Sequence, residues 1–146
     1  HLDISRPGPI YDTEGNHLGT HQGLHNYTIG QRRGLGISLD HPVYVVKLDP
    51  QQNALIVGRN EEVFSRGLVA TDINWVSITK PKSEIKVKAK IRYNASEFPA
   101  VVVPQNDDKV KVMFEEKQRA VTPGQSVVFY NGELVLGGGI IAKKIS

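Results

Sequence analysis

Residues 122–141 read TPGQSVVFYNGELVLGGGII, and this stretch decides the fold class. Two apolar runs, 125–130 and 133–136, flank Asn131-Gly132, and an Asn-Gly pair between apolar runs is the strongest short signal for a β-hairpin. The glycines at 137–139 are followed by further apolar residues. We therefore expect the chain to stay in the sheet there, through a bulge or a sharp bend.

The rest of the chain repeats this pattern of short apolar runs separated by turn residues. No run of about ten or more residues has helical periodicity. Hairpins are predicted for residues 10–12 with 17–21 and for 43–48 with 54–58, further strands for 67–72, 85–93, 100–103 and 109–114, and one helical turn for 61–64, capped by Asn60. Many short strands predict a mainly β fold. We expect a small central β-domain over residues 1–72, followed by a six-stranded β-barrel over residues 73–146.

The charges are unevenly distributed between these two parts. Residues 1–72 hold 6 Lys+Arg against 8 Asp+Glu, a net of −2, whereas residues 73–146 hold 12 against 7, a net of +5. Such asymmetry favours a polyanion partner for the basic half, although surplus lysine is also common on ordinary surfaces. No apolar run approaches the length of a membrane span, so we expect no membrane association. The absence of cysteine is compatible with the cytoplasm, where we expect the protein to be located.

The sharpest local pattern is IKVKAKIR at residues 85–92. Side chains alternate across a strand, so one face carries four cations and the other packs on the barrel core. The cations are Lys86, Lys88, Lys90 and Arg92, preceded by Lys80 and Lys82; the apolar face carries Ile85, Val87, Ala89, Ile91 and Tyr93. Contact with an RNA backbone would relieve the repulsion along this row. A solvated strand face that prevents aggregation is the alternative.

A second constellation is TIGQRRGLG at residues 28–36. Arg32 and Arg33 suit phosphate contacts, and Gln31 suits a base edge or an exposed amide. The segment lacks the Lys-Ser/Thr ending of a phosphate-binding loop, and a tight structural loop is the alternative.

No group of residues predicts catalysis or a metal site. His17, His21 and His25 recur every four residues, but glycines interrupt them and no cysteine or clustered carboxylate completes a ligand set. The chain contains no cysteine at all, and the adjacent acidic pairs point to opposite faces of a strand. We therefore assign no catalytic residue, no metal ligand and no cofactor to this chain.

Three stretches together carry a resemblance to a known family. They are PGPI at 7–10 with the glycines and histidine that follow to Gly23, the TIGQRRGL segment after Tyr27, and AVTPGQ at 120–125 with its continuation to Ile140. In this order they resemble the C-terminal part of the tRNA-specific 2-thiouridylases, formerly described as tRNA methyltransferases. The resemblance implies a central β-domain and a β-barrel like those of translation elongation factors.

The resemblance also implies what lies outside these residues. An N-terminal domain would hold ATP, Mg²⁺ and a first cysteine, and a persulfide-bearing cysteine would come shortly before His1. ATP would activate the wobble uridine of a tRNA, and the persulfide would deliver sulfur received from a sulfur-relay protein. This chain would then be the tRNA-binding, non-catalytic portion of a tRNA-uridine 2-sulfurtransferase and inactive alone. The alternative is a barrel that braces the enzyme or binds a protein without touching RNA.

Overall fold

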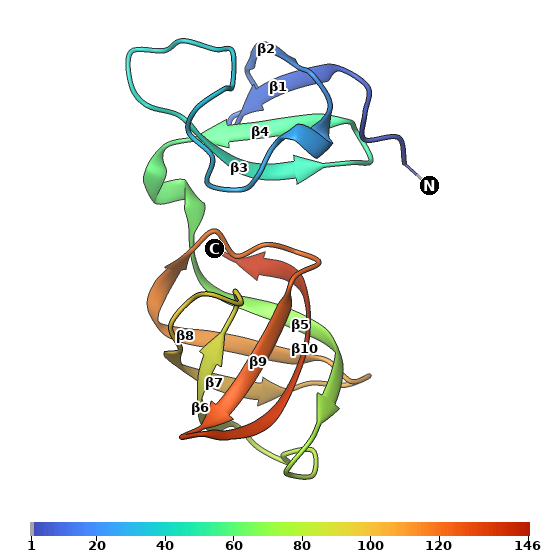
Figure 1. The fold of residues 1–146 in the computed structure, drawn as a ribbon, viewed down its shortest axis with the longest axis vertical. Helices are drawn as coiled ribbons and strands as arrows, with labels where there is room; N and C mark the ends of the chain where they lie inside the picture. Colours follow the sequence, from blue (N-terminus) through green and yellow to red (C-terminus); the bar gives the residue numbers. More distant parts are fainter. Residues whose placement is uncertain (1) are drawn as a thin grey trace. The chain divides into compact units, whose positions relative to one another are not determined.

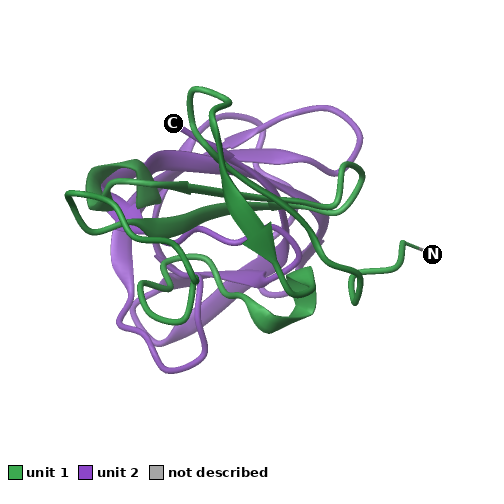
Figure 2. Cartoon of the chain, turned by 90° about the horizontal axis from the view of Figure 1, so that it is seen from above, with its two compact units in different colours: residues 1–63 green, residues 64–146 purple. Residues whose placement is uncertain are grey.

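The computed structural model describes residues 2–146 and divides the chain into two compact units, residues 1–63 and 64–146 (Figures 1 and 2). The sequence placed the division after Asp72, which lies within a strand of the second unit. Asp72 has a φ of 53°, and the pairing register shifts beside it, so its turn-like character marks a β-bulge. The mainly β fold, with a smaller sheet and a six-stranded barrel, is confirmed.

The first unit is a four-stranded sheet in the order β2-β1-β4-β3. Its strands are β1 Gly8–Asp12, β2 His17–His21, β3 Tyr44–Asp49 and β4 Ala54–Gly58. Both predicted hairpins are confirmed as antiparallel pairs, and β1 joins them by pairing with β4 in parallel. In the first hairpin, Asp12 Oδ1 accepts the backbone N–H groups of Glu14 and Asn16, which shapes the turn.

The glycine-rich segment after the 3₁₀ helix η1, Leu24–Asn26, has no regular structure and packs on this sheet. Leu35 is buried in the same core as Ile10 and Val45, while Tyr27 is only partly covered. Apolar side chains between the glycines therefore anchor the segment, and the polar ones in between face solvent.

The buried side chain of His21 joins both hairpins. Its Nε2 lies 2.7 Å from the carbonyl oxygen of Asn53, and its Nδ1 accepts the backbone N–H of Gly23 at 3.0 Å. The second contact fixes the tautomer with the proton on Nε2. A Cβ atom on Gly8 would lie 2.8 Å from the same Nε2, so only glycine fits there. The His21 side chain therefore has a structural role in the first unit.

The second unit is a closed antiparallel barrel in the order β10-β5-β8-β7-β6-β9 (Figure 1). The 3₁₀ helix η2, Asn60–Val63, precedes it and overlaps the predicted helical turn, but Asn60 lies within the helix and Phe64 already belongs to β5. Its strands are β5 Phe64–Trp75, β6 Ile85–Lys90, β7 Phe98–Pro104, β8 Val110–Arg119, β9 Ser126–Asn131 and β10 Leu134–Ile145. Alternate side chains fill the interior, around the fully buried Phe129.

The three consecutive glycines at 137–139 lie inside β10, which continues past them in the barrel, as predicted. Here β10 pairs with β5 on one side and β9 on the other, with register shifts along both. A Cβ at Gly137 or Gly139 would lie within 2.6 Å of a β5 carbonyl oxygen, and one at Gly138 would lie 2.6 Å from a β9 carbonyl oxygen. The glycines are therefore required by close backbone approach.

Candidate nucleic-acid interface

The lysine row of the barrel lies on β6. Lys86 and Lys88 are exposed and Lys90 is half-buried, whereas Val87 and Ala89 are buried in the core. The predicted alternation is therefore confirmed along β6. Consecutive lysines on this face are roughly 6.6 Å apart, two residues of strand rise.

The prediction for Tyr93 was wrong, because this residue does not share the apolar face. The strand ends at Lys90, and a turn follows in which the N–H of Ala95 donates to the carbonyl of Arg92. The Tyr93 side chain is 93% exposed as a result.

The β6 lysines lack acidic partners within residues 2–146. The ion pairs of Asp3 with Arg6 and of Asp40 with His41 lie in the first unit and do not involve these lysines. Like charges along one strand repel each other, so this face gains stability from any anion that binds it.

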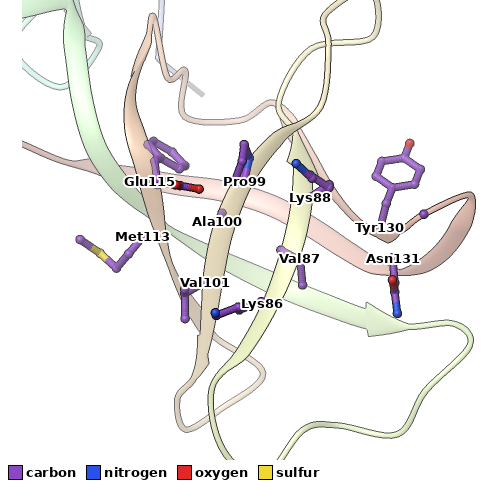
Figure 3. Close-up of a pocket in the computed structure, with 12 residues that line it drawn as sticks. Lys86, Val87, Lys88, Pro99, Ala100, Val101, Met113, Glu115, Tyr130 and Asn131 are labelled. Atoms are coloured by element: carbon purple, nitrogen blue, oxygen red, sulfur yellow. The ribbon is translucent and has the colours of Figure 1, made fainter.

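A surface hollow of about 580 Å³ adjoins the first two lysines of the row (Figure 3). Lys86 and Lys88 border it on β6, and the pairing register places Val101 and Pro99 beside them on β7. Its further lining includes Met113, Phe114 and Glu115 on β8 and Tyr130, Asn131 and Gly132 around the end of β9. The hollow thus combines an apolar floor with cationic groups and a single carboxylate.

A second hollow of about 340 Å³ includes Lys90, Arg92, Tyr93 and Tyr130 in its lining. The Lys90 ammonium lies 5.8 Å from the centroid of the Tyr130 ring, a cation–π contact. Arg92 has a structural task as well: its guanidinium donates to the backbone carbonyls of Arg119 and Ala120.

The other predicted cations of the barrel precede β6, in the segment that follows β5. Lys80 donates from Nζ to the carbonyl of Gln105 at 3.2 Å, while Lys82 is exposed. Neither borders the two hollows. The structure therefore groups Lys86 with Lys88 and Lys90 with Arg92, and leaves Lys80 and Lys82 apart from these pairs.

Gln31, Arg32 and Arg33 belong to the first unit. The Gln31 amide is used inside its own loop: Oε1 accepts the N–H of Thr28, and Nε2 donates to the Arg33 carbonyl at 2.7 Å. Both arginines are exposed. Arg32 borders a shallow hollow of about 370 Å³ that also includes Asp40. Hydrogen bonding to His41 lowers the pKa of the Asp40 carboxyl, so this hollow also carries a negative charge.

Two backbone amides of the glycine-rich loop are already hydrogen-bonded within the first unit. In the glycine-rich loop, the N–H of Gly30 donates to the Val45 carbonyl and that of Gln31 donates to the Thr28 carbonyl, so these amides cannot cradle a phosphate. Within residues 2–146, no group of three His, Asp or Glu side chains is placed to hold a metal ion. No helix in that range is long and apolar enough to cross a membrane.

Tyr130 is the functional candidate that sequence reasoning missed. A local signal existed, because Phe129 belongs to the apolar run and its neighbour must face outward. The pairing of Lys88 with Tyr130 joins β6 to β9, however, and a strand-by-strand interpretation does not predict that neighbourhood. Pro99, Val101 and Met113 were missed for the same reason.

Two family models match the chain. Residues 1–59 match the tRNA methyl transferase PRC-barrel domain, and residues 65–141 match the aminomethyltransferase beta-barrel domain. The two matches meet near the observed division between the units.

Curated relatives give the same result at high identity. The chain is 63% identical over 138 residues to the tRNA-specific 2-thiouridylase MnmA of Halothermothrix orenii, covering 94% of this chain and 38% of that protein. Identity is 56% over 140 residues to MnmA 1 of Caldanaerobacter subterraneus and 54% over 136 residues to MnmA of Acetivibrio thermocellus, with coverage of 96% and 93% of this chain and 38% of each relative. The matched region is the C-terminal part of these proteins. The chain therefore belongs to the tRNA-specific 2-thiouridylase family and corresponds to its C-terminal portion.

Proposed function

We propose that this chain is the tRNA-binding, non-catalytic portion of a tRNA 2-thiouridylase. The observation that carries the proposal is the β6 face, where Lys86, Lys88 and Lys90 lie in one row without an acidic partner in the described residues. The relatives are named for action on tRNA, whose phosphate backbone is the polyanion that such a row suits.

Sulfur transfer itself is assigned to the part of the parent enzyme outside these residues. The chain has no cysteine to carry a persulfide, and two amides of its glycine-rich loop already donate to backbone carbonyls. We expect the purified 146-residue chain neither to hydrolyse ATP nor to thiolate tRNA. Turnover by this chain would contradict the assignment. The sulfur-relay protein is proposed as a partner of the parent enzyme, and the cytoplasm as its location.

The test is a triple substitution in the full-length enzyme, Lys86→Gln with Lys88→Gln and Lys90→Gln. Each lost phosphate contact removes about 0.7–0.9 from the slope of log affinity against log salt, so the slope should become shallower by about 2–3. Titration of tRNA against the enzyme at several salt concentrations measures it.

A matched control removes the same charge elsewhere on the barrel. The exposed residues Lys109, Lys117 and Lys143 border neither hollow, and their replacement by glutamine should leave the salt slope near that of the wild type. Unchanged affinity and slope in the β6 variant would refute the face as a contact site.

A bracing or protein-binding barrel is the second candidate. It is favoured by the structural use of Arg92 and Lys80, which donate to backbone carbonyls of the barrel, and by the apolar floor of the larger hollow. In that case the β6 variant would keep both its tRNA affinity and its salt slope.

A further inference from the structure

The Tyr130 side chain lies between the two hollows on the outer face of the barrel. It borders both of them, whereas Lys86 and Lys88 border only the larger and Lys90 only the smaller. Its neighbour Phe129 is fully buried, so strand alternation directs the Tyr130 ring away from the core. In Figure 3 the ring projects from β9 beside Lys88, its partner in the register.

Tyr130 has different neighbours in the two hollows. The Lys90 ammonium covers one face at 5.8 Å from the centroid, and Lys90 borders only the smaller hollow. Tyr130 also borders the larger hollow, whose lining includes Pro99, Val101 and Met113. That hollow offers an aromatic surface, an apolar floor and two ammonium groups in about 580 Å³, a volume typical of small-molecule sites.

These groups together suit a flat, partly apolar ligand that carries a negative charge. An unpaired nucleotide has these properties, because its base stacks on an aromatic ring and its phosphates bind lysine. A duplex stem does not, because its bases are already stacked on one another and only the backbone is presented. An acidic protein segment would satisfy the lysines and would leave the aromatic face unused.

We propose that the larger hollow binds an unpaired nucleotide of the RNA, with its base against Tyr130 and its phosphates at Lys86 and Lys88. The proposal rests on the proposed function, since it specifies how the same face recognises RNA. It goes beyond that function by separating two contributions. The lysines supply salt-dependent affinity, and the tyrosine supplies a preference for unpaired RNA.

The test compares two RNA probes and three substitutions in the 146-residue chain. The probes are a single-stranded RNA of about 10 nucleotides and the same strand annealed to its complement. Tyr130→Leu removes the ring, Tyr130→Phe keeps it, and Tyr11→Leu removes a half-buried tyrosine of the first unit as a control.

We expect Tyr130→Leu to weaken single-strand binding by about 5- to 150-fold, the effect of losing one stacked base. Duplex binding and the salt slope should stay unchanged, because no cation is removed. Tyr130→Phe and Tyr11→Leu should bind like the wild type.

Equal single-strand affinity for the leucine and phenylalanine variants would overturn the stacking proposal. The lysine contacts would still be supported after that result if the β6 triple variant showed the expected shallower salt slope. Failure of the wild-type chain to bind either RNA would instead contradict the proposed function.

Photocrosslinking provides a measurement that does not depend on the folding of a variant. A 4-thiouridine in the single-stranded probe should crosslink to the wild-type peptide that contains Tyr130. Crosslinks confined to other peptides would overturn the proposal.

Discussion

Replacing Gly138 with alanine tests whether close backbone approach, and not flexibility, explains the three glycines of β10. A Cβ atom there would lie 2.6 Å from the carbonyl oxygen of Val127 and 3.4 Å from the Cα of Val128, both backbone atoms of β9. Gly138 and Val128 are paired in the register, so these atoms cannot move away without disturbing the strand ladder. The new methyl group must therefore displace one strand from the other.

The magnitude follows from two opposing contributions. Overpacking a well-packed site costs about 1–3 kcal/mol. Reduced entropy of the unfolded chain returns about 0.4–1 kcal/mol when glycine becomes alanine. We expect a net loss of about 1–2 kcal/mol, which lowers the melting temperature by roughly 4–16 °C in a unit of this size.

Tryptophan fluorescence, excited selectively so that tyrosine does not contribute, reports on the barrel because the chain has one tryptophan. It is Trp75 in β5, with its ring centroid 5.9 Å from that of Phe129. Gly15→Ala in the first unit should leave the Trp75 transition in place. Gly124→Ala in the barrel adds strain without crowding, since φ at Gly124 is 91° and a Cβ added there would have no neighbour within 4 Å. We expect it to cost about 1 kcal/mol. A Trp75 transition in Gly138→Ala at or above that of the wild type would refute the crowding argument.

Three further predictions concern groups that organise local structure. Arg92→Met removes both hydrogen bonds to backbone carbonyls and should lower the free energy of unfolding, followed by Trp75 fluorescence, by about 1 kcal/mol. A larger effect on RNA affinity than on stability would mean that the guanidinium also binds RNA. Gln31→Leu breaks two loop hydrogen bonds and should cost the first unit about 1–2 kcal/mol in thermal unfolding, with Gln31→Glu intermediate because it keeps the acceptor. Hydrogen bonds from Asn16 lower the pKa of Asp12 from its ordinary 3.8, so the stability that Asp12 contributes is full above that value and is lost as the pH falls through the folded pKa. Thermal melts of wild type and Asp12→Asn should therefore converge on acidification, and a constant difference would contradict this role.

Local patterns in the sequence predicted most of the strands. Both hairpins of the first unit and the Asn131-Gly132 hairpin of the barrel were readable because turn residues separate apolar runs. The lysine row on β6 was readable because its period is that of a strand. These features depend only on residues close in sequence.

Features set by distant strands were not predictable in this way. The turn-like Asp72 concealed a bulge within β5, and its left-handed φ accompanies the register shift against β10. Tyr93 was placed on the apolar face because the sequence does not show where pairing with β9 ends. The larger hollow needs β6 through β9 to be neighbours, which no single segment specifies.

Closure of the barrel limits how any partner can be recognised. Each of its strands pairs with a neighbour on both sides, so along the doubly paired residues the backbone N–H and C=O groups that an added strand would need are already used. A ligand of this unit is therefore recognised by side chains on the outer surface of the barrel. Its selectivity can change one substitution at a time while the ladder beneath stays intact.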